Sequence, residues 1–166
     1  KAKGYGVGKS LVEDDKLALA QEILGKAGEK RVNFLLPSDH LLATSLDKDA
    51  QTKLADSFPF PEGWMAVDIG PKTVAAYSQI ISQAKMIFWN GPLGVFEIDA
   101  FSQGTVKIAE AVAASKALSI VGGGDSIAAV EKAGVSKKIS HISTGGGAAL
   151  EYLANETLPG IEALNS

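Results

Sequence analysis

Short apolar runs alternate along the chain with longer segments whose apolar residues recur every three to four positions. The short runs are bounded by glycine, proline, asparagine or aspartate, a pattern typical of buried strands that end in turns. Five of these runs predict strands, at residues 32–36, 64–69, 86–89, 118–121 and 139–143.

The helical pattern also occurs in five segments. The first begins at Ser10 or Glu13 and ends at Gly25 or Gly28, and the others cover 73–84, 102–114, 125–133 and 148–153. Strands that alternate with helices predict an α/β fold, a three-layer α/β/α Rossmann-like parallel sheet of about five strands. Right-handed crossovers would bring the carboxyl ends of all strands to one edge. Residues 40–61 lack a clear period and are expected to form a long, functional connection.

Composition narrows the class of protein. With 166 residues, 46% hydrophobic and 21% charged, the chain is expected to form one globular domain. A net charge of −3 argues against nucleic acid as the main partner. The absence of cysteine excludes thiol chemistry and fits a reducing compartment, so a cytoplasmic location is expected. We expect neither a membrane span nor a signal peptide, because no long apolar run is present.

The triple glycine Gly122–Gly124 carries the strongest candidate chemistry, because it joins a predicted strand to a predicted helix. Backbone N–H groups at such a helix start are unpaired and the helix dipole favours an anion there. Asp125 would repel a phosphate unless a divalent cation lay between them, so the motif indicates a magnesium nucleotide. The alternative is that Asp125 is only an N-cap and the glycines only a tight turn. This stretch alone leaves both interpretations open.

Other turns are expected to meet the triple glycine at the same edge of the sheet. They lie at 37–39, 68–71, 90–92 and 144–147. Asp68 is expected to cap the helix that follows it. By contrast, Gly8-Lys9-Ser10 only superficially resembles the end of a P-loop, because Lys3 stands where that motif needs glycine. A histidine-based metal site is not expected, because His40 and His141 are far apart in the sequence.

Several motifs resemble, in order and spacing, the C-terminal nucleotide-binding domain of the phosphoglycerate kinase family. The most specific are GWMAVDIGPKT (63–73), WNGPLGVFE (89–97), IVGGGDS (120–126) and SHISTGGGAALEYL (140–153). KGYGVGKSLVEDDK (3–16), FLLPSDHLLA (34–43) and LPGIEAL (158–164) extend the resemblance over the whole chain. It implies a glycolytic enzyme that reversibly transfers a phosphoryl group from 1,3-bisphosphoglycerate to Mg-ADP, giving ATP and 3-phosphoglycerate.

The resemblance also implies a role for individual residues. Asp125 would bind the magnesium ion, while the amides of Gly123 and Gly124 and the hydroxyl of Ser126 would hold the phosphates. Ser126 stands where many members have threonine, and either hydroxyl can donate. Gly146 and Gly147 would face the transferred phosphoryl group together with Gly123 and Gly124, as catalytic N–H donors.

For the rest of the nucleotide, the resemblance implies a set of residues around the sugar and the base. Asn90 would lie near the triphosphate, and Glu97 would accept hydrogen bonds from the ribose hydroxyls. The remaining contacts would be Pro92, Gly94 and Val95 beside the nucleoside, and Leu46, Ala66 and Val67 around adenine. Ala66 replaces a common glycine and would narrow the adenine slot.

The resemblance further implies that residues 1–166 are a partial C-terminal nucleotide-binding domain. The family's first strands, a GGAKV-type loop whose lysines contact phosphates, and the whole phosphoglycerate-binding N-terminal domain have no counterpart in this sequence. We therefore expect a partial site and no kinase activity from the chain alone. The resemblance implies a monomeric protein, but the exposed apolar faces of this chain predict that it self-associates. The alternative is a non-enzymatic structural or interaction fragment that does not bind nucleotide; a dehydrogenase is disfavoured because its glycine fingerprint is missing.

Overall fold

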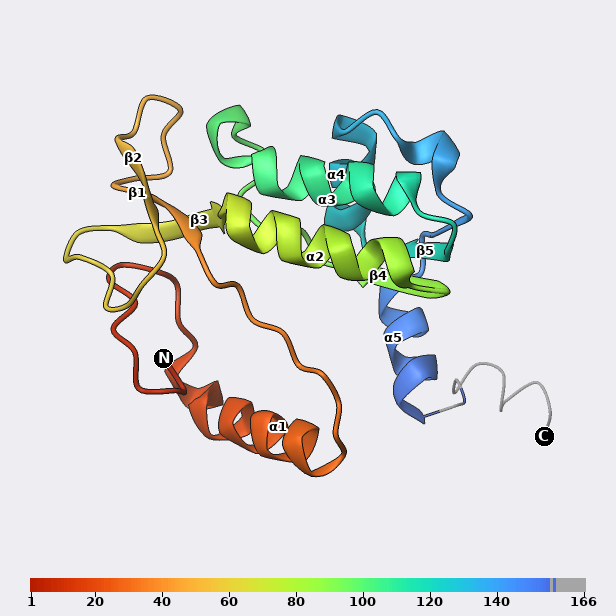
Figure 1. Cartoon of the computed structure of the whole chain (residues 1–166), viewed down its shortest axis with the longest axis horizontal. Coiled ribbons are helices and arrows are strands. Elements are labelled where there is room, and N and C mark those ends of the chain that lie inside the picture. Colours follow the sequence, from red (N-terminus) through yellow and green to blue (C-terminus); the bar gives the residue numbers. More distant parts are fainter. Residues whose placement is uncertain (156, 158–166) are drawn as a thin grey trace.

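The computed structural model describes residues 1–155 and residue 157, so the segment LPGIEAL (158–164) lies outside the described residues. The strands form two three-stranded sheets (Figure 1). The antiparallel sheet has the order β2-β1-β3 and contains β1 (His40–Ala43), β2 (Thr52–Ala55) and β3 (Met65–Ile69). The parallel sheet has the order β4-β5-β6 and contains β4 (Met86–Asn90), β5 (Leu118–Gly122) and β6 (His141–Ser143).

The α/β class predicted from the sequence is confirmed, whereas the arrangement of strands differs from a continuous parallel sheet. Residues 40–61 were predicted as a connection, yet they contain β1 and β2, which pair antiparallel. β1 also pairs antiparallel with β3. β3 therefore ends the antiparallel sheet, and the parallel sheet begins with β4, which pairs with β5.

Helices cover the parallel sheet. α2 (Pro71–Gln83) and α3 (Gln103–Ala114) lie side by side, and α4 (Gly124–Lys132) packs against α3 (Figure 1). α5 (Gly146–Asn155) contacts β5. Short 3-10 turns form η1 (Asp14–Lys16), η2 (Asp99–Phe101) and η3 (Ser136–Lys138). Burial of apolar side chains stabilises this part, and its core consists of Ile69, Trp89, Ile108, Ala109, Val112, Val121, Val130, Val135 and Ile139.

The first 39 residues pack differently. α1 (Leu17–Glu29) has no buried residue, and Figure 1 shows it set apart from the other helices. The strand predicted at 32–36 does not form, although Val32 and Phe34 have the residue types of a strand. A strand needs the backbone N–H and C=O groups of another strand to pair with, and within the described chain this segment pairs with no strand. Its apolar side chains are consequently about half exposed.

An apolar groove of about 600 Å³ lies between α1, the extended segment and the antiparallel sheet. Its walls include Leu17, Ile23, Leu36, His40 and Phe60. We call it the apolar groove below. Among the described residues, no helix is both long enough and apolar enough to cross a membrane.

The Gly8-Lys9-Ser10 segment is a docking turn, in agreement with its poor match to a P-loop. The Lys9 N–H donates to the Trp64 carbonyl at 2.7 Å, and the Ser10 hydroxyl accepts from the Ala66 N–H at 3.0 Å. Gly8 has a φ of +58°, and a Cβ there would collide with the Trp64 carbonyl. The segment therefore ties the amino-terminal residues to β3.

Candidate functional site

The triple glycine forms the junction between β5 and α4. Gly122 ends the strand, Gly123 is the N-cap with a φ of 89°, and Gly124 begins the helix. This φ favours glycine, and a Cβ at Gly123 would also lie 2.6 Å from Asn90 Oδ1, so the Asn90 side chain would have to move. Asp125 lies in the first turn and is not the N-cap. The structure therefore does not support the interpretation of Asp125 as only an N-cap.

The turn that follows β6 packs directly against this junction. A Cβ at Gly146 would collide with the Gly123 backbone nitrogen and would lie 2.6 Å from the Gly123 Cα. Asn90 pairs in register with Gly122, and Gly122 with Ser143. The starts of α4 and α5 thus meet at the carboxyl edge of the parallel sheet, as the crossover argument predicts. Gly146 is buried, whereas Gly124 and Gly147 are exposed.

A small hollow of about 150 Å³ lies at this edge, which we call the glycine pocket. It is lined by Asn90, Gly91, Gly123, Gly124, Asp125 and Ser126. The Asn90 and Asp125 side chains are exposed to it, whereas Ser126 is completely buried. The Ser126 hydroxyl oxygen accepts from the Gly91 N–H at 2.5 Å. Ser126 therefore holds the turn after β4, and its direct contact with a phosphate stays a prediction.

The donor set of the glycine pocket fits a magnesium ion bound together with phosphates. Asp125 offers one exposed carboxylate, and Asn90 offers an amide oxygen close to the Gly123 position. Magnesium is commonly held by one or two carboxylates plus substrate phosphates and water. In the part of the chain that the structure describes, no group of three or more acidic, histidine or cysteine side chains could form an all-protein cage.

The predicted nucleoside wall, residues 92–97, leads from β4 to η2. The Val95 N–H donates to the Val67 carbonyl at 2.8 Å, and the Leu93 N–H donates to the Thr105 hydroxyl at 3.1 Å. Gly94 lies against β3, since a Cβ there would be 2.7 Å from the Val67 carbonyl oxygen. Pro92 and Val95 are half-buried, and Glu97 is exposed. The wall is thus anchored by its backbone, which leaves the Glu97 carboxylate open to solvent.

The three residues predicted to contact adenine, Leu46, Ala66 and Val67, do not form one surface as the wall at 92–97 does. Val67 is buried at 1% exposure, in a cluster with Ala43 and Phe101. Ala66, the preceding strand residue, lines the apolar groove instead. The buried cluster and the apolar groove lie on different sides of β3, although the pairing with β1 shifts register at Val67. Leu46 is 55% exposed in the connection between β1 and β2. Val67 supports the wall from behind, and the roles of all three toward adenine stay predictions.

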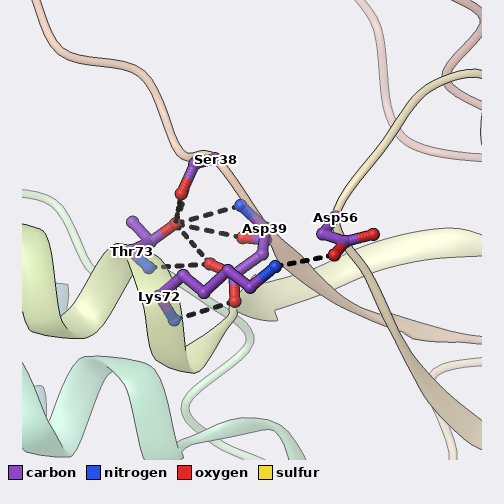
Figure 2. A network of polar contacts seen from close by, with 5 residues as sticks. All are labelled: Ser38, Asp39, Asp56, Lys72 and Thr73. Carbon is purple, nitrogen blue, oxygen red and sulfur yellow. Dashed lines mark hydrogen bonds and ion pairs between the residues drawn. The ribbon is translucent and has the colours of Figure 1, made fainter.

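Asp39 is a structural residue that sequence patterns did not single out. Its carboxylate oxygens accept from the Lys72 N–H at 2.8 Å and from the Thr73 N–H at 2.7 Å, which caps α2 (Figure 2). The Thr73 hydroxyl also bonds to the carboxylate at 2.7 Å, and it accepts from the Ser38 N–H at 2.9 Å. Burial raises the pKa of Asp39, but these hydrogen bonds outweigh burial and the net pKa is lowered. Because the partners are 33 and 34 residues apart, no local capping pattern reveals them.

Asp68 caps a different helix from the one expected. Asp39 occupies the start of α2, and Asp68 Oδ2 instead accepts from the Gly104 N–H at 2.6 Å, in the first turn of α3. Its Oδ1 accepts from the Ile69 N–H at 2.9 Å and lies against the Cα of Gly94. Burial raises the pKa of Asp68 to about 6 despite these bonds. The turns at 37–39 and 68–71 therefore serve helix starts. The glycine pocket is built from the turns after β4 and β5, and the turn at 144–147 packs against it through Gly146.

Comparison with known proteins identifies relatives over almost the whole chain. The model of a family described as phosphoglycerate kinase matches residues 1–156. The phosphoglycerate kinases of Microcystis aeruginosa and Moorella thermoacetica are 54% and 53% identical over 99% of this chain. The chain spans 42% of the length of each of these two relatives.

Solved structures give the same result. Phosphoglycerate kinase from Coxiella burnetii superposes with a TM-score of 0.94 at 46% identity, over 99% of this chain and 42% of that one. The enzyme from Pyrococcus horikoshii superposes with a TM-score of 0.75 at 36% identity, over 99% of this chain and 41% of that one.

Proposed function

Because the chain belongs to the phosphoglycerate kinase family, we propose that it supplies the magnesium-nucleotide side of a kinase active site. In the whole protein, this site would transfer a phosphoryl group reversibly between 1,3-bisphosphoglycerate and Mg-ADP, giving ATP and 3-phosphoglycerate. The observation that carries the proposal is the contact between Gly146 and Gly123, which brings two glycine-rich helix starts together at one edge of the parallel sheet, beside the glycine pocket. The free N–H groups and the dipole at each helix start favour an anion, so two helix starts that lie close together would suit a chain of phosphates.

The residues of the glycine pocket and of the adjacent start of α5 would work by position and charge. The N–H groups of Gly123, Gly124, Gly146 and Gly147 would donate to phosphate oxygens and stabilise the charge that spreads over them during transfer. Asp125, with the Asn90 amide oxygen nearby, would hold a magnesium ion, whose charge would offset that of the phosphates. Ser126 would keep the Asn90–Gly91 turn in place through its bond to the Gly91 N–H.

The wall at 92–97 would receive the nucleoside. The exposed Glu97 carboxylate would accept hydrogen bonds from the ribose hydroxyls, while Pro92, Gly94 and Val95 would contact the sugar and base. Leu46, Ala66 and Val67 are proposed around adenine. The opposite orientations of Ala66 and Val67 make the backbone of β3 a better candidate for this contact than both side chains together.

We propose that residues 1–166 are part of a C-terminal nucleotide-binding domain in a longer cytoplasmic protein. The apolar groove supports this, because its exposed apolar lining would be covered by further chain in a protein the length of its relatives. Phosphoglycerate would bind to a separate N-terminal domain. On its own the chain would be inactive, with a partial site, and would self-associate through the groove, which sedimentation at increasing concentration measures.

Calorimetry with Mg-ADP tests the nucleotide site directly. We expect the chain to bind Mg-ADP and the Asp125→Ala variant to lose about tenfold or more in affinity, because one carboxylate anchors the metal. Glu131→Ala is the matched control, since Glu131 is an exposed acid on the same helix. A chain that binds no Mg-ADP, or an Asp125→Ala variant that binds normally, would favour the structural alternative. A coupled assay tests inactivity, and turnover by the chain alone at rates comparable to intact relatives would refute it.

A further inference from the structure

Lys132, the last residue of α4, joins the two parts of the proposed nucleotide site. Its ammonium group donates to the Phe96 carbonyl at 2.6 Å and lies 3.5 Å from the Glu97 carbonyl. It also forms an ion pair with Asp99 at 2.6 Å. The three protons of a lysine ammonium match these three acceptors, and the side chain is only 28% exposed.

The two ends of α4 therefore face different parts of the site. The amino-terminal end carries Gly124 and Asp125 at the glycine pocket, and the carboxyl-terminal end holds the backbone on either side of the Glu97 side chain. A nine-residue helix spans about 13 Å and keeps this separation nearly constant. The length of α4 thus sets the distance between the pocket and the wall at 92–97.

The hydrogen bonds from Lys132 to the two carbonyl groups hold the backbone around Glu97 more firmly than the ion pair with Asp99 does. Asp99 is 94% exposed, and exposed ion pairs contribute little to stability. The Phe96 residue is buried at 6% exposure, and a charge-assisted bond to its carbonyl is short and strong. Val95 is anchored to β3 by its own N–H, so the role of Lys132 begins beyond Val95, at the residue that carries the ribose contact.

We propose that Lys132 is a positioning residue for nucleoside recognition, which fixes Glu97 relative to the phosphate-binding start of α4. This inference rests on the proposed function, because it assumes that Glu97 accepts from the ribose hydroxyls. It assigns Lys132 an effect on one part of the nucleotide only. Loss of the ammonium should weaken recognition of the ribose and leave recognition of the phosphates intact.

The test compares Mg-ADP with Mg-2′,3′-dideoxy-ADP, which lacks the ribose hydroxyls, by calorimetry on the 166-residue chain. We expect Lys132→Met to weaken Mg-ADP binding about tenfold, corresponding to about 1.4 kcal/mol, and to change dideoxynucleotide binding by less than about twofold. Lys132→Arg, which keeps a donor toward the carbonyls, should recover most of the affinity. Lys107→Met is the matched control, because Lys107 pairs with Glu110, one turn away on the same helix α3, and both side chains are about half exposed.

The outcomes separate the inference from the proposed function. If the wild-type chain binds neither nucleotide, the proposed site fails and the inference fails with it. If the wild type binds both and Lys132→Met weakens both equally, Lys132 only stabilises the fold and the inference is overturned. It is also overturned if Lys132→Met binds Mg-ADP normally. Unchanged dideoxynucleotide binding by Lys132→Met would show in the same experiment that the variant is folded.

Discussion

The parallel-sheet region and the amino-terminal region contain similar proportions of apolar residues but use them differently. Around β4, β5 and β6, apolar side chains from the strands and from α3 and α4 form a closed core. In the first 39 residues, α1 buries no side chain, and Phe34, Leu35 and Leu36 are 48%, 44% and 49% exposed. An apolar pattern thus leads to a stable element only where a second surface is present to cover it.

Truncation of one core side chain should separate the two regions most clearly. Ile108→Ala should lower the free energy of unfolding by about 2–5 kcal/mol, because Ile108 is 4% exposed and the variant leaves a cavity. Leu19→Ala in α1 removes a side chain that is 51% exposed. It should change the free energy of unfolding by about 0.5 kcal/mol or less. Urea denaturation measures both. Equal losses would mean that α1 contributes to the same core and that the contrast is wrong.

Asp68 links the antiparallel sheet to the parallel-sheet region, since it lies on β3 and caps α3, and it should make stability depend on pH. Its pKa is raised to about 6 in the folded protein, above the ordinary value of 3.8. Between those two pH values the folded state binds more protons than the unfolded state. The contribution of Asp68 to the free energy of unfolding is therefore present at low pH and is lost as pH rises. Asp68→Asn should therefore gain stability relative to wild type by up to about 3 kcal/mol between pH 4 and pH 7.

Asp39 is the control for this titration, because it caps a helix with its pKa shifted in the opposite direction. Its pKa is lowered, so its contribution is present above pH 4 and is lost as pH falls. Asp39→Asn should be destabilised at pH 7, and the difference from wild type should shrink in acid. Thermal unfolding at several pH values measures both variants. Parallel pH profiles for the two substitutions would contradict the assignment of opposite shifts.

The contact between the two glycine turns should tolerate almost no added volume. Gly146→Ala should cost about 1–3 kcal/mol, because the new methyl group meets the Gly123 backbone. Gly147→Ala has open space around its Cβ and should be neutral or stabilising by about 0.5–1 kcal/mol, since alanine favours a helix. Thermal unfolding of the pair compares them directly. An unaffected Gly146→Ala variant would show that the turns are further apart than in the structure.

The sequence by itself determined the strand, the turn and the helix start that form the glycine pocket. Glycine at 123 and 124 followed by Asp125 indicates a strand, a turn and a helix start, and the structure places these residues at a strand end beside Asn90. The parallel pairing of β4, β5 and β6, with their carboxyl ends at one edge, also follows from the alternation of strands with crossover helices. These features were predictable because each depends on neighbouring residues or on a general rule of chain handedness.

Only the tertiary structure decided which distant groups became partners. Asp39 caps α2 and Asp68 caps α3, although each carboxylate lies more than 30 residues from the helix N–H group that it caps. Lys132 meets Phe96 for the same reason. A hydrogen bond across such a separation depends on how whole elements pack, which a local pattern does not encode. The segment 32–36 shows the converse, because it has the pattern of a strand but, within the described chain, no neighbour to pair with.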